Sequence, residues 1–346
     1  MTLESATPTS RLLDISNLEV RFRTGGQEVA VVDGISFHIN ERETLGVVGE
    51  SGCGKSVTSL SIMGLVPNPP GRVAGGSIDF AGRDLLQLRE RDMRRIRGNE
   101  ISMIFQEPMT SLNPVFTVGR QIDEVLHLHN RMSRPEARER SIGMLERVGI
   151  PRPAAIYESY PYQLSGGMRQ RVMIAIGLAC EPRLLIADEP TTALDVTIQA
   201  QILDLMRDLR DTTDTATLFI THDLGVVAEM CDRVVVMYAG QVVEEAPVDD
   251  LFNNTQHPYT LGLMASMPDA SRKVERLQAI PGQVPPPGSV ARGCRFAERC
   301  DQVMPRCREE MPPLYRIDQG HTSRCWLHAD HHEPINTDRL LEEPSA

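Results

Sequence analysis

The stretch VVGESGCGKSVTSL, residues 47–60, decides the fold of this 346-residue chain. A short apolar run leads into Gly49–Ser56, which fits the pattern G-x-x-x-x-G-K-[ST]. In that pattern successive backbone N–H groups converge on an anion, and the N-terminus of the next helix adds partial positive charge. The sequence therefore predicts a buried strand, a phosphate-binding loop and a helix that begins near Gly54.

The residue types in this loop indicate how a nucleotide is held. Its glycines let the backbone turn tightly and approach phosphate oxygens. Lys55 is expected to reach the β- and γ-phosphates, and the Ser56 hydroxyl is expected to ligate Mg²⁺. The nucleotide contacts are predicted for Gly49, Ser51, Gly52, Cys53, Gly54, Lys55, Ser56 and Val57. Cys53 is interpreted as a small loop residue rather than as a metal ligand.

Composition narrows the class of protein. The net charge of −11 argues against a nucleic-acid partner, because such proteins usually carry a basic excess. No run approaches 18 apolar residues, so the chain is not expected to cross a membrane by itself. The first 14 residues lack the pattern of a secretory signal, which favours a cytoplasmic location where disulfides are rare.

The rest of the chain predicts an α/β fold with an added C-terminal module. A polar tail covers residues 1–11, and two strands around the Gly25-Gly26 turn predict an antiparallel layer before the loop. The charged stretch 84–100 favours a solvated amphipathic helix, and residues 119–180 are mostly helical in pattern. Further strands are predicted at 101–105, 183–190, 215–223 and 233–246, and residues 281–293 are rich in proline and glycine, as in a linker.

Two further motifs complete a nucleotide site. The strand Leu184–Ala187 ends at Asp188, which is expected to hold Mg²⁺ through water, and Glu189 follows as a candidate general base. Ser165, Gly166 and Gly167 open a predicted helix, which makes a second anion-binding N-terminus. A second phosphate binder is useful if two subunits sandwich each nucleotide.

Taken in order, these motifs resemble those of an ABC-transporter ATPase. The matching stretches are Gly49–Ser56, Gln106, Leu164–Gln170, Leu184–Glu189, Ala193-Leu194-Asp195 and His222. The resemblance covers about residues 12–250 and implies a P-loop ABC ATPase, with a RecA-like core, an antiparallel β layer and a helical subdomain at about 107–180. Met168 stands where many members carry glutamine, and little loss of activity is expected because the Ser-Gly-Gly start is intact.

The resemblance also implies roles for single residues. Gln106 resembles the glutamine that contacts Mg²⁺ and the attacking water, and His222 resembles the histidine that contacts the γ-phosphate. Asp195 would organise a dimer interface. Phe22 is the best aromatic candidate to stack on adenine, although an aromatic residue in a strand is commonly part of the core.

Three stretches resemble one branch of the family, the dipeptide/oligopeptide importers. They are residues 106–122, residues 257–268 and the cysteine-bearing end of the extension at 251–346. This implies a peripheral ATPase on the cytoplasmic face of the membrane. Its partners would be a second ATP-binding subunit, copy or paralogue, two transmembrane permease subunits and, indirectly, an extracytoplasmic peptide-binding protein. The alternatives are an importer ATPase for another small solute, a soluble ABC ATPase, or a redox-sensing iron–sulfur protein with vestigial motifs.

Four cysteines cluster near the C-terminus, at Cys294, Cys300, Cys307 and Cys325. No pair has the C-x₂₋₄-C spacing of zinc sites, and the common ferredoxin spacing is absent. Spacing alone therefore predicts a four-thiolate site without naming its metal. The importer resemblance implies a [4Fe–4S] cluster; zinc and metal-free buried thiols stay open. Neighbouring arginines could offset a cluster's negative charge: Arg292, Arg295, Arg299, Arg306, Arg308 and Arg324.

Overall fold

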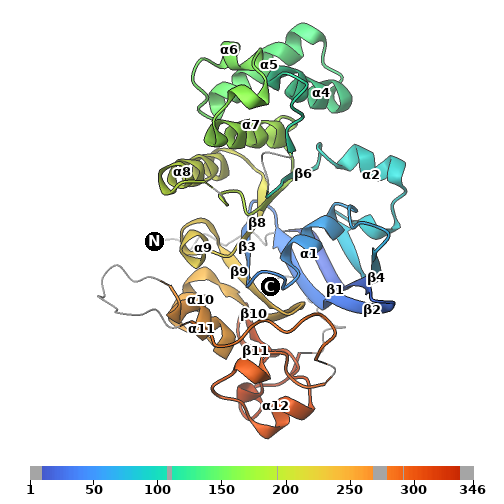
Figure 1. Ribbon diagram of the computed structural model, residues 1–346, viewed down its shortest axis with the longest axis vertical. Coiled ribbons are helices and arrows are strands. Elements are labelled where there is room, and N and C mark those ends of the chain that lie inside the picture. Colours follow the sequence, from blue (N-terminus) through green and yellow to red (C-terminus); the bar gives the residue numbers. More distant parts are fainter. Residues whose placement is uncertain (1–9, 107–110, 193, 268–278, 291, 336–346) are drawn as a thin grey trace, which may run out of the picture. The chain divides into compact units, whose positions relative to one another are not determined.

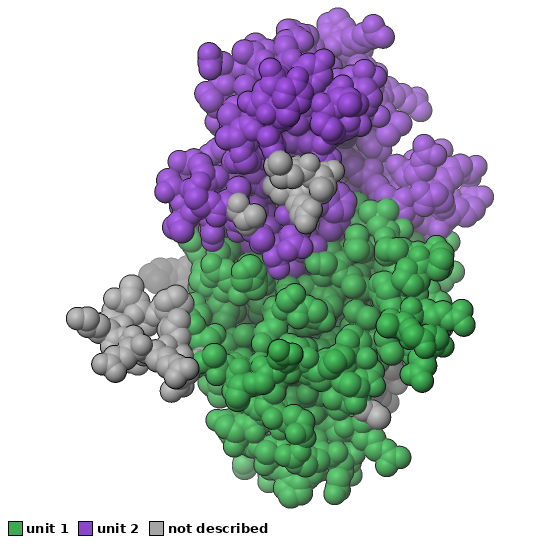
Figure 2. Space-filling view, viewed as in Figure 1, with its two compact units in different colours: residues 1–40, 45–87, 221–346 green, residues 41–44, 88–220 purple. Residues whose placement is uncertain are grey.

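The computed structural model describes residues 10–106, 111–192, 194–267, 279–290 and 292–335. Ala193 of the predicted motifs therefore lies outside the described residues, as do parts of the N-terminal tail, of the stretch 106–122 and of the extension. The chain forms two compact units, which Figure 2 colours separately. Unit 1 comprises Met1–Asn40, Leu45–Gln87 and Thr221–Ala346, and unit 2 comprises Glu41–Thr44 and Leu88–Ile220.

The predicted antiparallel layer is present in unit 1. Strands β1 (Arg11–Thr24) and β2 (Gln27–Asn40) form a hairpin around Gly25-Gly26, and β4 (Gly71–Phe80) pairs with the other edge of β1, followed by the short β5 (Arg83–Asp84). Several apolar side chains of this sheet are fully buried, at Leu13, Ile15, Val20, Ile39, Ile78 and Phe80. Successive side chains of a strand point to opposite faces of the sheet, so burial of one face places apolar residues at alternating positions, which is the pattern that predicted these strands.

A second set of strands in unit 1 carries the phosphate loop. Strand β3 (Thr44–Val48) runs parallel to β9 (Arg233–Tyr238), and β10 (Gln241–Pro247) follows β9 antiparallel after the predicted turn at Ala239-Gly240. Helix α1 (Lys55–Ile62) begins directly after the loop. Helices α9 (Leu224–Met230), α10 (Val248–Asn253) and α11 (Pro258–Ala265) also belong to this unit.

The C-terminal extension continues the same sheet, which the sequence did not predict. Strands β11 (Tyr315–Asp318) and β12 (His321–Ser323) form a hairpin, and β12 pairs with β10. Figure 1 shows β10 and β11 in the lower part of the picture. Short helical turns lie at Ala297–Arg299, Pro305–Glu309 (α12) and Trp326–His328. Ala297, Cys307, Tyr315 and Trp326 form a small buried cluster.

Unit 2 contains three parallel strands and most of the helices. Strands β6 (Ile101–Ile104), β7 (Leu184–Asp188) and β8 (Ala216–Thr221) lie in register, with every residue of β7 and β8 buried. The predicted helical region is confirmed; its helices are α4 (Val118–Asn130), α5 (Arg134–Arg147), α6 (Pro153–Tyr157) and α7 (Gly166–Leu178). Helix α8 (Val196–Thr212) was not predicted.

The charged stretch 84–100 differs from the single helix that was predicted. The side chain of Asp84 accepts a hydrogen bond from the backbone N–H of Leu86 (3.0 Å), which fixes a turn followed by a 3₁₀ segment at Leu85–Gln87. The α-helix here, α2, spans only Glu90–Ile96. A local side-chain bond to the backbone therefore competes with helix formation. None of the described helices is both long and apolar enough to cross a membrane.

Candidate nucleotide site

The phosphate loop of unit 1 has a backbone that depends on glycine. At Gly49 a Cβ atom would lie 2.2 Å from the carbonyl oxygen of Met237, so no side chain fits there. Gly54 is the N-cap of α1 and has a left-handed backbone, with φ of 107°. Ser51 and Gly52 at the tip are exposed, whereas Lys55 is 6% exposed. The backbone of the loop is thus constrained at Gly49 and Gly54, while its tip at Ser51 and Gly52 is accessible to an anion.

Lys55 lies inside the curve of this loop. Its Nζ donates to the carbonyl oxygens of Gly49 (2.6 Å) and Glu50 (3.2 Å). Ser56 and Val57 are half-buried at the start of the helix. The ammonium group is therefore held inside the loop, and its contact with the β- and γ-phosphates stays a prediction.

Cys53 is a packing residue of the loop. Its side chain is fully buried, and burial raises the pKa of its thiol. The backbone oxygen of Cys53 accepts from the N–H of Gly240 (2.9 Å), which ties the loop to the β9–β10 turn. Cys53 is absent from the residues that line the pocket of the four C-terminal cysteines. Its surroundings agree with its interpretation as a small loop residue.

Two other predicted residues belong to unit 1. Phe22 is half-buried on β1, opposite Val29 and Gly71, and a Cβ on Gly71 would lie 2.8 Å from its ring. His222 follows β8 and is exposed. The next residue, Asp223, caps α9 by accepting from the N–H of Gly225 (2.9 Å). The exposed His222 thus lies, along the chain, between the buried strand β8 and the capped helix α9.

Unit 2 brings Gln106 and Glu189 together. Asp188 is the last residue of β7 and is 4% exposed. The carboxylate of Glu189 accepts from Gln106 Nε2 (3.0 Å) and from the Thr192 hydroxyl (2.7 Å). The backbone of Glu189 is left-handed, with φ of 48°, an uncommon conformation that clusters at functional sites. Thr192 was not predicted; its only signal is a hydroxyl three residues after the carboxylate.

The helix that was predicted to begin at Ser165 is present, and its binding of an anion stays a prediction. Ser165 caps α7 by accepting from the N–H of Met168 (3.3 Å), and Ser165 and Gly166 are exposed. Asp195 caps α8 by accepting from the N–H of Ile198 (2.9 Å). A Cβ on Gly167 would lie 2.6 Å from Ile198 Cγ2, so glycine is required where the starts of α7 and α8 pack together.

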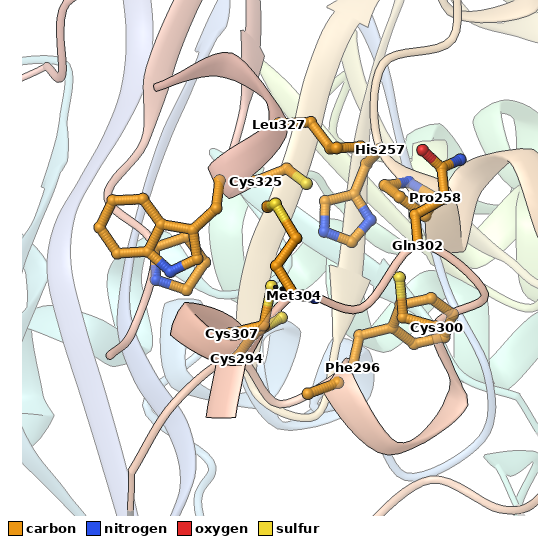
Figure 3. Close-up of a pocket in the computed structure, with 13 residues that line it drawn as sticks. His257, Pro258, Cys294, Phe296, Cys300, Gln302, Met304, Cys307, Cys325 and Leu327 are labelled. Atoms are coloured by element: carbon orange, nitrogen blue, oxygen red, sulfur yellow. Dashed lines mark hydrogen bonds between the residues drawn. The ribbon is translucent and has the colours of Figure 1, made fainter. Parts of the chain in front are cut away.

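The four C-terminal cysteines line one pocket. Figure 3 shows their side chains around it, together with His257, Phe296 and Met304. Burial raises the pKa of Cys294 to about 11 and that of Cys325 to about 12. Among the described residues, no group of three or more His, Cys, Asp or Glu side chains is arranged to hold a metal ion. The cysteines share a pocket, but the iron–sulfur cluster stays a prediction.

Five of the six arginines near these cysteines have other partners. Arg295 binds Asp33, Arg299 binds Glu50, and Arg308 binds Glu298. Arg306 pairs with Glu310 and lies over the Trp326 ring, and Arg324 donates to the carbonyl oxygens of Val242 and Pro312. Proximity in sequence therefore did not reveal where these guanidinium groups bind.

Comparisons with known proteins agree with this arrangement. Residues 32–192 match the ABC transporter family model, and residues 243–307 match the oligopeptide/dipeptide transporter C-terminal region. The chain is 55% identical to the oligopeptide transport ATP-binding protein AppD of Bacillus subtilis, over 93% of this chain and 98% of that protein. It is 53% identical to OppD of the same organism, over 92% and 89%.

A solved structure is also similar. It is the dimeric post-hydrolysis state of the ATP-binding cassette MJ0796 bound to ADP and Pi, with a TM-score of 0.62 and 26% identity over 68% of this chain and 98% of that one. Together with the phosphate loop, the Gln106–Glu189 contact and the capped Ser165 helix, these matches show that the chain belongs to the oligopeptide/dipeptide branch of the ABC-transporter ATP-binding proteins.

Proposed function

We propose that this protein is the ATP-hydrolysing subunit that powers import of dipeptides or oligopeptides across the cytoplasmic membrane. The observation that carries the proposal is the carboxylate of Glu189, held by Gln106 and Thr192 directly after the buried strand β7. The hydrogen bonds from Gln106 and Thr192 fix the position of this carboxylate, and a carboxylate so placed can take a proton from an attacking water, so Glu189 is suited to act as general base.

The other predicted residues bind different parts of the nucleotide and its Mg²⁺. Lys55 and the amides of Gly49–Ser56 bind the β- and γ-phosphates, and Ser56, Gln106 and Asp188 hold Mg²⁺, which neutralises charge on the phosphates. His222 contacts the γ-phosphate, and Phe22 stacks on adenine. Ser165, Gly166 and Gly167 bind the γ-phosphate of a nucleotide carried by a second ATP-binding subunit, and Asp195 helps to order the interface between the two subunits.

Transport follows from the sharing of ATP between two subunits. ATP bridges the Lys55 loop of one subunit and the Ser165 helix of the other, which stabilises a closed dimer. Closure shifts two permease subunits between inward-facing and outward-facing states, and hydrolysis at Glu189 removes the bridge. The protein acts on the cytoplasmic face of the membrane, and a peptide-binding protein delivers substrate outside. Residues 12–250 form the motor and residues 251–346 the family-specific extension.

The four cysteines are proposed to hold a [4Fe–4S] cluster. Four thiols line one pocket, yet the described residues offer no group arranged for a single metal ion. Four cysteine thiolates are the usual ligands of such a cluster, and the resemblance to peptide importers favours it over zinc. Its role is structural, because ATP hydrolysis transfers no electron. Anaerobically purified protein is expected to be brown and to contain four irons per chain; colourless protein with stoichiometric zinc would contradict the assignment.

The transport function is tested with the intact complex. The chain is purified from membranes with its permeases and reconstituted into vesicles, and uptake of labelled peptides is measured with ATP supplied to the ATPase side. Uptake should require ATP and should be lost in Glu189→Gln. Transport of a different small solute but not of peptides would favour the alternative importer, and a chain that purifies without any permease partner would favour a soluble ABC ATPase.

A further inference from the structure

The C-terminal extension reaches the phosphate loop through Arg299. The Arg299 guanidinium makes a two-pronged ion pair with Glu50, the second residue of the loop, at 2.6 Å (Nη1 to Oε2) and 2.9 Å (Nη2 to Oε1). The Arg299 side chain is 5% exposed and that of Glu50 is 31% exposed. Paired geometry of this kind is directional and stronger than a single contact, and lysine cannot reproduce it.

Arg299 is itself held in place by other contacts. Its Nε donates to the carbonyl oxygen of Pro281 (2.8 Å), and its Nη1 donates to the Tyr238 hydroxyl (3.3 Å). The guanidinium carbon lies 5.7 Å from the centre of the Tyr238 ring. The ion pair therefore differs from a mobile surface pair, because one partner is already ordered by the extension and by the end of β9.

The backbone of Glu50 is held as well. Its N–H donates to the hydroxyl of Tyr259 (2.9 Å), a fully buried residue of α11 that packs with Tyr238 and Phe296. The carbonyl of the same residue accepts from Lys55 Nζ. The peptide unit that contains the Glu50 N–H also contains the Gly49 carbonyl oxygen, which accepts from Lys55 Nζ at 2.6 Å. The extension thus fixes a peptide unit that in turn positions the phosphate-binding lysine.

A second contact supports the other half of the loop. Arg295 donates to Asp33 and to the carbonyl oxygen of Ala239 in the β9–β10 turn. The next residue of that turn, Gly240, donates to the carbonyl of Cys53. Both arginines neighbour cysteines of the pocket in sequence, Arg295 after Cys294 and Arg299 before Cys300.

We propose that Arg299 and Tyr259 are positioning residues of the ATP site, which hold the phosphate loop in its binding geometry through Glu50. The proposal rests on the ATP-binding function assigned above. It makes the C-terminal extension part of the nucleotide site. Loss of either contact should weaken MgATP binding, while turnover at saturating MgATP should change little because the candidate general base is untouched.

The test uses the full-length chain and measures the Kd for MgATP together with KM and kcat. Arg299→Gln removes the charge and leaves the Glu50 carboxylate without its partner, so the Kd should rise about tenfold. Arg299→Lys should recover only part of that loss. Tyr259→Phe keeps the buried ring and removes the oxygen that accepts from Glu50, and it should raise the Kd by a few-fold. In each case kcat should stay within about threefold.

Arg233→Gln is the matched control. Arg233 makes an ion pair with Glu245 at the opposite end of β9 from the loop, and the two side chains are 11% and 15% exposed. This change should lower the melting temperature and leave the Kd for MgATP within twofold. A double-mutant cycle with Glu50→Gln adds a direct measure of coupling: the combined loss should be clearly smaller than the product of the two single losses.

Three outcomes decide the matter. A raised Kd with a near-normal kcat supports the proposal. A folded Arg299→Gln protein that binds MgATP within twofold of wild type overturns it while leaving the ATP site intact, and if that variant does not fold, Glu50→Gln and Tyr259→Phe are read by the same criterion. Wild-type protein that fails to bind MgATP overturns the proposed ATP site and the positioning role together.

Discussion

The phosphate loop and the end of β7 are both predicted by short motifs, but they are supported in different ways. Glu50 and Cys53 of the loop depend on residues as distant in sequence as Tyr259 and Arg299. Glu189 is fixed by Thr192, three residues away, and by Gln106. The difference teaches that a motif can identify a site while the residues that hold it lie in a separate extension. Binding and hydrolysis should therefore respond to different mutations.

The largest expected effect separates these two functions. Glu189→Gln keeps the shape of the side chain and removes its basicity, so ATP hydrolysis should fall by about 10²–10⁴-fold. MgATP binding should be retained because the phosphate loop is unchanged. Phosphate release and equilibrium binding are measured on the same preparation. Hydrolysis at the wild-type rate would exclude Glu189 as the base.

The second prediction removes the anchor of the extension. Glu244 on β10 is fully buried; its carboxylate accepts from the backbone N–H groups of Gln256 (2.6 Å) and His257 (3.0 Å) and contacts His321 Nε2 at 2.9 Å. Glu244→Ala leaves these groups without a partner and should cost about 3 kcal/mol of stability. The melting temperature and the affinity for MgATP should both fall. A variant as stable as wild type would show that this network does not hold the extension.

A smaller effect is expected at Thr192. Its hydroxyl donates to Glu189 at 2.7 Å, and Thr192→Val keeps the shape of the side chain without the hydrogen bond. Loss of one such bond is worth about 1 kcal/mol, which corresponds to a roughly fivefold lower kcat. The Kd for MgATP should not change. A lower affinity with an unchanged kcat would contradict the assignment of MgATP binding to the phosphate loop and of hydrolysis to Glu189.

The smallest expected effect concerns acid sensitivity in unit 2. Partial burial lowers the pKa of His129 on α4. The imidazole of His129 then binds a proton more readily in the unfolded chain than in the folded one. The stability of the folded protein should therefore decrease as pH falls below about 6.5. Urea unfolding at neutral and mildly acidic pH is compared in wild type and His129→Gln. An identical pH dependence in the two proteins would remove His129 as a contributor.

The sequence predicted those features that depend on local chemistry. The β1–β2 hairpin, the strand before Gly49, the helix cap at Ser165 and the carboxylates after β7 are confirmed as structural features, because turns, caps and buried strands follow from nearby residues. Helix α8 was missed, although its N-cap, Asp195, had been identified for another reason.

Long-range contacts could not be predicted in this way. The pairing of β12 with β10 and the contacts of Arg295 and Arg299 join segments far apart in the chain. Both arginines were considered as groups that could offset the charge of a cluster because they neighbour the cysteines in sequence, and in the fold their side chains bind Asp33 and Glu50. A contact between an arginine and a distant carboxylate leaves no spacing pattern, so only the fold reveals it.

One paired measurement tests the central claim most directly: the Kd for MgATP and kcat in Arg299→Gln and Glu189→Gln, prepared as the same full-length chain. The account predicts that Arg299→Gln raises the Kd about tenfold with kcat nearly unchanged, whereas Glu189→Gln lowers kcat at least a hundredfold with the Kd nearly unchanged. If Arg299→Gln instead lowers kcat and leaves the Kd at its wild-type value, the division between a braced binding loop and a separate hydrolytic carboxylate is wrong.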